Sequence, residues 1–301
     1  MTSALALASY AALVGALAPY AVTRARWPHR APGVAVFVWH GLMATFVGTT
    51  SLAVYHLIVG ERHVHNGVQG LLSVCGLVPA VLPGQSTPLV ADVAQLLAAL
   101  VLLLPVGWLL HTVRSTRRVQ CRHRDMLALV GVPAPEHGAT IVEHDTPVVY
   151  CLPGRYRQVV VTSGAVETLS PEQLYAVLEH ERAHIAGRHH LLHAVTEAFE
   201  RAFPRLPLAT QAREQTSVLL EMIADDRALR SCSQEALADA ICEVAAGQGP
   251  RAAFGAGGSS VPIRVRRILA ARAAPPPGPG TWLGVVSGAV VVALVPLLLS
   301  C

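Results

Sequence analysis

One short pattern has the residue types and spacing for metal chemistry, His180-Glu181-Arg182-Ala183-His184. In a helix, residues four apart lie one turn apart on the same face, so the imidazoles of His180 and His184 can bind one zinc ion. The Glu181 carboxylate then projects beside a water on that metal and can take its proton. The same pattern can also arise by chance on a solvent-exposed helix face, because the chain has 14 histidines.

A third ligand is available about 40 residues downstream, in the apolar segment 218–228. A catalytic zinc takes three protein ligands and keeps one position open, and Glu221 can be the third. Asp225, four residues on, can accept the outer N–H of a ligating histidine and fix its tautomer. Alone, this pair would be interpreted as an exposed acidic face. With the His180–His184 pattern, it predicts one Zn²⁺ per chain.

A strong start signal precedes the histidines and predicts the helix that must position them. Ser170 fits the N-cap, Pro171 the first helical position and Gln173 the third, as in a capping box. The helix then runs through the apolar residues of segment 174–178 to His180.

Three β-branched runs precede this helix and predict a small antiparallel sheet. They are Thr140–Glu143, Val148–Leu152 and Gln158–Thr162, and Pro153-Gly154 is typical of a turn between the last two. The predicted soluble domain is therefore of the α+β class.

The composition predicts that this domain is attached to a membrane. The chain is 52% hydrophobic and 14% charged, whereas soluble domains contain about 25% charged residues. Of 23 Arg and 19 acidic residues, 19 and 17 lie in segment 112–280. Uncharged apolar runs predict four transmembrane helices, at 4–22, 34–59, 93–113 and 281–300. The uncharged segment 66–91 is short and interrupted by proline, so we expect it to be re-entrant or interfacial; a fifth span is the open alternative.

The predicted organisation has three parts: a membrane domain at 1–113, a zinc domain at 114–274, and a Pro/Gly linker with the fourth span at 275–301. Arginines follow the first and third spans and precede the fourth, so the positive-inside rule places the zinc domain in the cytoplasm of a plasma-membrane, multi-pass protein. Segment 112–280 carries 19 Arg against 17 acidic residues, a net charge of +2. That balance disfavours nucleic acid as a partner.

These motifs resemble those of a known group of proteins. The pattern HExxH followed by ExxAD is similar to the gluzincin metallopeptidases. The order CLPGR, VVVTSG, LSPEQL, VLEHERAHIAGRHH and EMIADDRAL resembles the membrane-bound BlaR/MecR-type peptidases. The resemblance implies that His180, His184 and Glu221 hold zinc, that Glu181 is general base and acid, and that Asp225 supports a ligand.

The resemblance also implies a substrate site and a substrate. The run Val148, Val149, Tyr150 and Cys151 resembles the edge strand that binds an extended peptide, although it could equally be an ordinary core strand. The protein substrate implied is a repressor of the BlaI type. Because the chain ends at Cys301 without a penicillin-binding sensor domain, we do not expect direct β-lactam sensing.

Two alternatives remain open from the sequence. The same chemistry fits an HtpX-like protease for membrane-protein quality control. A non-catalytic, zinc-stabilised signalling scaffold is the third hypothesis, but a structural zinc normally has four protein ligands and gains nothing from Glu181. The oxyanion-stabilising residue is not assigned; His189, His190, His193 and Arg227 are the candidates.

Overall fold

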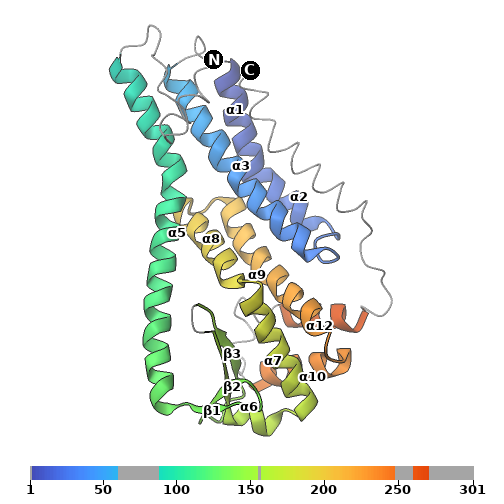
Figure 1. Ribbon diagram of the computed structural model, residues 1–301. Helices are drawn as coiled ribbons and strands as arrows, with labels where there is room; N and C mark the ends of the chain where they lie inside the picture. The colour runs from blue at the N-terminus through green and yellow to red at the C-terminus, as the bar shows by residue number, and fades with distance from the viewer. Residues whose placement is uncertain (1, 60–87, 155–156, 248–259, 271–301) are drawn as a thin grey trace. The chain divides into compact units, whose positions relative to one another are not determined.

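The computed structural model describes residues 2–59, 88–154, 157–247 and 260–270 (Figure 1). The chain divides into two compact units. The first contains residues 1–111, 195–213 and 277–301, and the second contains residues 112–194 and 214–276. The two units are described separately below.

The first unit is helical. Its elements include α1 (Thr2–Ala12), the π-helical turn η1 (Leu13–Leu17), α2 (Ala18–Arg24), α3 (Pro32–Val59) and the first part of α5 (Pro88–Val130). Three stretches are long and apolar enough to cross a membrane: Ala4–Arg24, Pro32–Ile58 and Leu89–Val130. They contain the first three predicted spans, except that the second stretch ends one residue before the predicted end at residue 59. The fourth predicted span, and segment 66–91 up to residue 87, lie outside the described residues.

Small and aromatic side chains pack the first unit. Helix α1 contributes Leu7 to a buried cluster with Leu52 and Ala53 of α3. Phe46 of α3 also meets the rings of Phe199 and Phe203 edge-on, at centroid distances of 6.1 and 5.3 Å. This edge-to-face geometry is favourable for aromatic pairs.

The second unit is built on a four-stranded sheet with the order β1-β2-β4-β3. Its strands are β1 (Val132–Ala134), β2 (Ala139–Val142), β3 (Val149–Leu152) and β4 (Gln158–Thr162). Strand β4 pairs with β3 antiparallel and with β2 parallel. The prediction of a purely antiparallel sheet is therefore wrong for the β2–β4 pair.

The burial of β4 explains this topology. Val159, Val160 and Val161 are 4%, 0% and 1% exposed, so the strand is covered on both faces. An uninterrupted apolar run of this kind belongs in the centre of a sheet. Strand β4 therefore inserts between β2 and β3, although β2 and β3 are consecutive in the chain.

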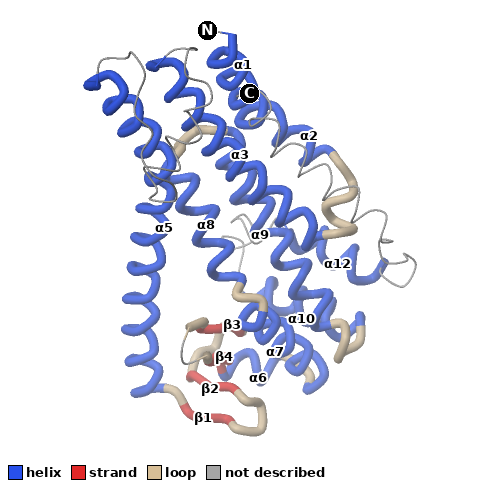
Figure 2. The backbone as a smooth tube through the Cα atoms, turned by 45° about the horizontal axis from the view of Figure 1, so that its top comes forward, coloured by secondary structure: helices blue, strands red, loops and turns tan. Residues whose placement is uncertain are grey.

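Helices complete the unit, and α6 and α7 lie next to the strands (Figure 2). They are α6 (Ser163–Thr168), α7 (Pro171–Ala186), α10 (Gln234–Gly247) and α12 (Val261–Ala270), together with those parts of α8 (His189–Ala202) and α9 (Pro207–Ala228) that lie outside residues 195–213. Leu174, Val177 and Leu178 of α7 pack with Val159 and Val161 of β4 in one buried cluster. This cluster fixes the position of α7 on the sheet.

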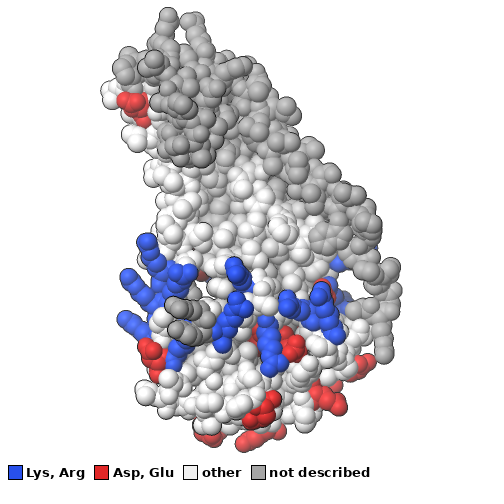
Figure 3. All heavy atoms as spheres, in the orientation of Figure 1, with Lys and Arg blue, Asp and Glu red and all other residues white. Residues whose placement is uncertain are grey.

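The charged side chains are unevenly distributed. The described parts of segment 1–111 contain three arginines and one aspartate, Arg24, Arg26, Arg30 and Asp92. Figure 3 shows the same unevenness on one face of the molecule, where Arg and acidic side chains gather together and a broad described surface carries none.

Candidate metal centre

The start of α7 is a complete capping box. The backbone N–H of Gln173 donates to the Ser170 hydroxyl at 3.2 Å, and the Ser170 N–H donates to Oε1 of Gln173 at 2.9 Å. Pro171 occupies the first turn. The helix start predicted from these residues is confirmed, and it sets the register in which His180 and His184 share one face.

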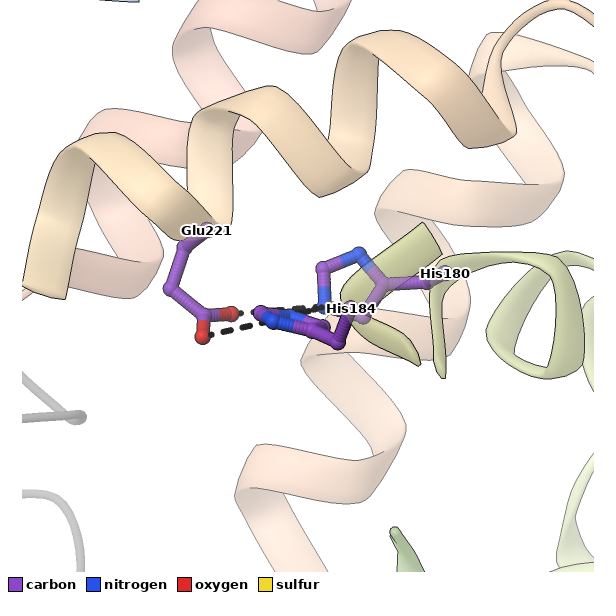
Figure 4. A group of neighbouring side chains, drawn as sticks. All are labelled: His180, His184 and Glu221. Atoms are coloured by element: carbon purple, nitrogen blue, oxygen red, sulfur yellow. Dashed lines mark hydrogen bonds and ion pairs between the residues drawn. The ribbon is translucent and has the colours of Figure 1, made fainter. Parts of the chain in front are cut away.

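Helices α7 and α9 bring three metal-binding side chains together (Figure 4). Nε2 of His180 and Nε2 of His184 are 3.1 Å apart. The Glu221 carboxylate lies 3.3 Å from Nε2 of His180 through Oε2, and 3.4 Å from Nε2 of His184 through Oε1. Two nitrogens and one carboxylate therefore converge on one point.

These distances fit a tetrahedral zinc ion. Ligand atoms about 2.0–2.1 Å from zinc, at tetrahedral angles, are separated from one another by about 3.3 Å. The two imidazole nitrogens, 3.1 Å apart, lie close to that value, and each has one Glu221 oxygen at a similar distance, Oε2 at 3.3 Å from His180 and Oε1 at 3.4 Å from His184. Two imidazoles with one carboxylate are also a ligand set of catalytic zinc sites. His180, His184 and Glu221 can thus hold zinc with little rearrangement.

The outer nitrogen of each histidine has a buried neighbour. Nδ1 of His180 lies 3.0 Å from Oδ1 of Asp225, a residue that is 0% exposed. Nδ1 of His184 lies 2.8 Å from Nδ1 of His189, which is 3% exposed. For Nε2 of His184 to offer its lone pair to a metal, its Nδ1 must carry the hydrogen and donate it to His189. Both neighbours thus orient a ligand.

A buried arginine that sequence reasoning missed completes the centre. Arg264 of α12 is 8% exposed. Its Nε and Nη2 donate to the two Asp225 oxygens at 2.9 and 2.7 Å, and its Nη1 lies 2.9 Å from Oε2 of Glu221. Burial raises the pKa values of both carboxyls, but the nearby cations outweigh it, and both lie below their usual values. Both groups are therefore ionised.

Glu181 lies beside the ligands and is half-buried. Burial raises its pKa above the usual value, and the charge of Glu221 adds to this effect, while His180 opposes it. The thiol of Cys151 in β3 hydrogen-bonds to the Glu181 carboxylate. Burial raises the pKa of Cys151, so the thiol stays protonated and can donate.

The sequence model of Peptidase family M48 matches residues 114–273, more than half of the chain. The chain belongs to Peptidase family M48. Members of this family are metal-dependent peptidases, and the match covers the three converging side chains. No curated protein and no solved structure matches the chain.

The predicted substrate strand of this M48 peptidase lies at the edge of the described sheet. Val149, Tyr150 and Cys151 belong to β3, and Val148 directly precedes it. Strand β3 pairs with β4 on one side, and no other described strand pairs with it. Cys151 brings this edge next to Glu181. The outer backbone groups of an edge strand are those that an added strand would use.

Among the candidates for oxyanion stabilisation, His189 is the one for which the structure indicates a different role. His189 lies against the ligand His184. A burial-lowered pKa of about 4 keeps it neutral at pH 7. Its contact supports a ligand, and the roles of His190, His193 and Arg227 stay predictions.

Proposed function

We propose that this M48 peptidase is an integral-membrane, zinc-dependent endopeptidase in which Glu181 is general base and general acid. The observation that carries the proposal is the convergence of His180, His184 and Glu221, whose ligand atoms lie within 4.8 Å of one another. The half-buried Glu181 beside this group is what separates an enzyme from a zinc-stabilised scaffold.

Zinc at this centre would supply Lewis acidity, lowering the pKa of water and polarising a carbonyl. Glu181 takes a proton from the attacking water onto its carboxylate as the water oxygen bonds to the scissile carbonyl carbon. As the C–N bond breaks, Glu181 gives this proton to the leaving nitrogen. Its raised pKa suits it to hold the proton between the two transfers, and the Cys151 thiol holds the carboxylate in position.

The substrate is an extended protein segment that adds to the edge of β3 by backbone pairing. Val148, Val149, Tyr150 and Cys151 form the pairing surface in this proposal. The contact between Cys151 and Glu181 supports it, because a segment held on this strand runs next to the general base.

For the cell, we propose regulated cleavage of a cytosolic repressor of the BlaI type by a cytoplasmic domain of a plasma-membrane protein. The BlaR/MecR-like sequence order and the arginine distribution support this role. Quality control of membrane proteins is the second candidate, because the HExxH motif is shared with HtpX-like proteases. The M48 match is at family level and favours neither role.

The test compares the purified, detergent-solubilised chain with Glu181→Gln on an unfolded protein reporter and on a repressor of the BlaI type. We expect one zinc per chain in both proteins and a loss of cleavage of about 10²–10⁴-fold in Glu181→Gln. Undiminished cleavage by Glu181→Gln contradicts the mechanism. Cleavage of the repressor at one bond supports the regulatory role, and indiscriminate cleavage of the reporter supports quality control.

A further inference from the structure

Arg264 reaches the metal centre from outside the two helices that carry the ligands. It belongs to α12, whereas the three ligands belong to α7 and α9. The side chain is 9% exposed and contacts both Glu221 and Asp225. Burying a guanidinium is costly unless its charge is paired, and here all its described partners belong to the metal centre.

The two oxygens of the Glu221 carboxylate have different neighbours. Oε2 lies 2.9 Å from Nη1 of Arg264 and 3.3 Å from Nε2 of His180, while Oε1 lies 3.4 Å from Nε2 of His184. An oxygen held by a guanidinium is less available to a metal than its neighbour. A Glu221 bound through both oxygens would fill the position that a water needs, since a catalytic zinc keeps one position open.

The same guanidinium holds Asp225 with a planar two-point contact. Both Asp225 oxygens accept from Arg264, and Oδ1 also lies 3.0 Å from Nδ1 of His180. Arg264 thereby fixes the oxygen that orients His180. A lysine keeps the charge but cannot make the forked contact to Asp225 and reach Glu221 together.

We infer that Arg264 is a positioning residue that limits Glu221 to one-oxygen metal coordination and orients His180 through Asp225. The C-terminal helix α12 is then part of the active centre. This inference rests on the proposed zinc peptidase function and deepens it by naming what keeps the fourth coordination position open.

The chain offers a matched control on the same helix. Arg267, three residues on, makes a similar forked contact with Asp226, at 2.6 and 2.8 Å. That pair is at the surface, where 43% of the Asp226 side chain is exposed. The same substitutions at Arg264 and Arg267 thus remove a guanidinium group from the same helix, in one case beside the metal ligands and in the other case away from them.

The experiment uses the full chain in detergent, stripped of metal and loaded with Co²⁺ or Zn²⁺, as wild type, Arg264→Lys, Arg264→Met, Arg267→Lys and Arg267→Met. Visible absorption of Co²⁺ reports the coordination number, because four-coordinate tetrahedral Co²⁺ absorbs more strongly than five- or six-coordinate Co²⁺. We expect weaker cobalt absorption in both Arg264 variants. At saturating zinc, we expect kcat to fall about 10–100-fold with little change in KM. The Arg267 variants should match wild type within about twofold.

Arg264→Lys decides the outcome, because it retains the charge that the buried carboxylates need and therefore folds. An unchanged cobalt spectrum in this variant overturns the inference, whatever its activity. The spectrum does not depend on cleavage. If wild type binds cobalt tetrahedrally but cleaves no protein, the proposed function fails, while the spectra of the variants still decide the role of Arg264.

Discussion

The apolar helices of the first unit carry few charged residues, whereas the metal centre of the second unit has charged side chains buried in its interior. In the described parts of segment 1–111, the charged residues are Arg24, Arg26, Arg30 and Asp92. None lies inside α3, which is 28 residues long. In the second unit, by contrast, charges are drawn into the interior, where Asp225 is 0% and Arg264 is 8% exposed.

This difference shows in which part of the fold charged groups can be buried despite the free energy that their desolvation costs. A buried ion is strongly unfavourable unless partners compensate it. At the metal centre, two carboxylates meet an arginine and two histidines, and a divalent cation would add to the compensation. On the apolar helices, the exposed side chains are hydrophobic instead, such as Leu96 at 70% and Leu100 at 57%. Such a surface is what lipid requires.

The largest expected effect tests the apolar side of the comparison. In an insertion assay on the α5 segment 88–130, Leu100→Arg places a charge near the middle of the predicted span 93–113. We expect it to raise the insertion free energy by about 2.5–3.5 kcal/mol, since arginine is costly at the centre of a membrane helix.

Leu129→Arg provides the matched control, because Leu129 lies on the same helix, is 87% exposed and follows the arginine-rich stretch. We expect this change to leave insertion unaltered. Equal insertion of the two variants would mean that this part of α5 does not cross a membrane.

The second prediction tests the charged side of the comparison. Asp225→Asn keeps the size of the buried side chain but removes the charge that Arg264 and His180 face. We expect zinc affinity to fall about 10–100-fold, as is usual when the partner of a metal-binding histidine is lost. Competition with a chelator measures the affinity.

Asp226→Asn is the control for this change. Asp226 is the next residue in the chain, and it pairs with Arg267 at the surface. Its loss should leave zinc affinity unchanged and alter stability by less than about 1 kcal/mol. If both variants lose affinity equally, burial of Asp225 is not what matters.

The third prediction sharpens the account of charge at the centre. Burial lowers the pKa of His180, but the Asp225 and Glu221 carboxylates outweigh it and raise the pKa to about 9. Below that pH the metal-free chain holds a proton on His180, which metal must displace. Zinc affinity should therefore rise about tenfold per unit between pH 6 and 8, with about one proton released per zinc. Titration calorimetry in buffers of different ionisation enthalpy checks this, and an affinity independent of pH would contradict it.

Local sequence patterns were sufficient to predict several elements of the fold and site. The capping residues Ser170 and Gln173 act within one turn, so the start of α7 could be predicted. Helical periodicity then put His180 and His184 on one face, and the same periodicity applied to Glu221 in α9. Strand β1 was missed because it has three residues, one of them Pro133, and so carries little pattern.

Long-range contacts could not be predicted from local pattern. Arg264 is one of several arginines in and around α12, and its spacing does not show that it folds onto Asp225, 39 residues earlier. His189 reaches His184 across the short turn between α7 and α8, where Arg188 adopts a positive φ of 51°. The parallel pairing of β2 with β4 likewise depends on which strand becomes buried.

The central claim is that His180, His184 and Glu221 hold one zinc ion with a position left open. X-ray absorption at the zinc edge of the metal-loaded full chain tests it most directly. The account predicts two imidazole nitrogens and oxygen ligands at about 2.0–2.2 Å, with no sulfur. A sulfur neighbour at about 2.3 Å would contradict it, because it would make Cys151, the thiol beside Glu181, a ligand and the site a closed one.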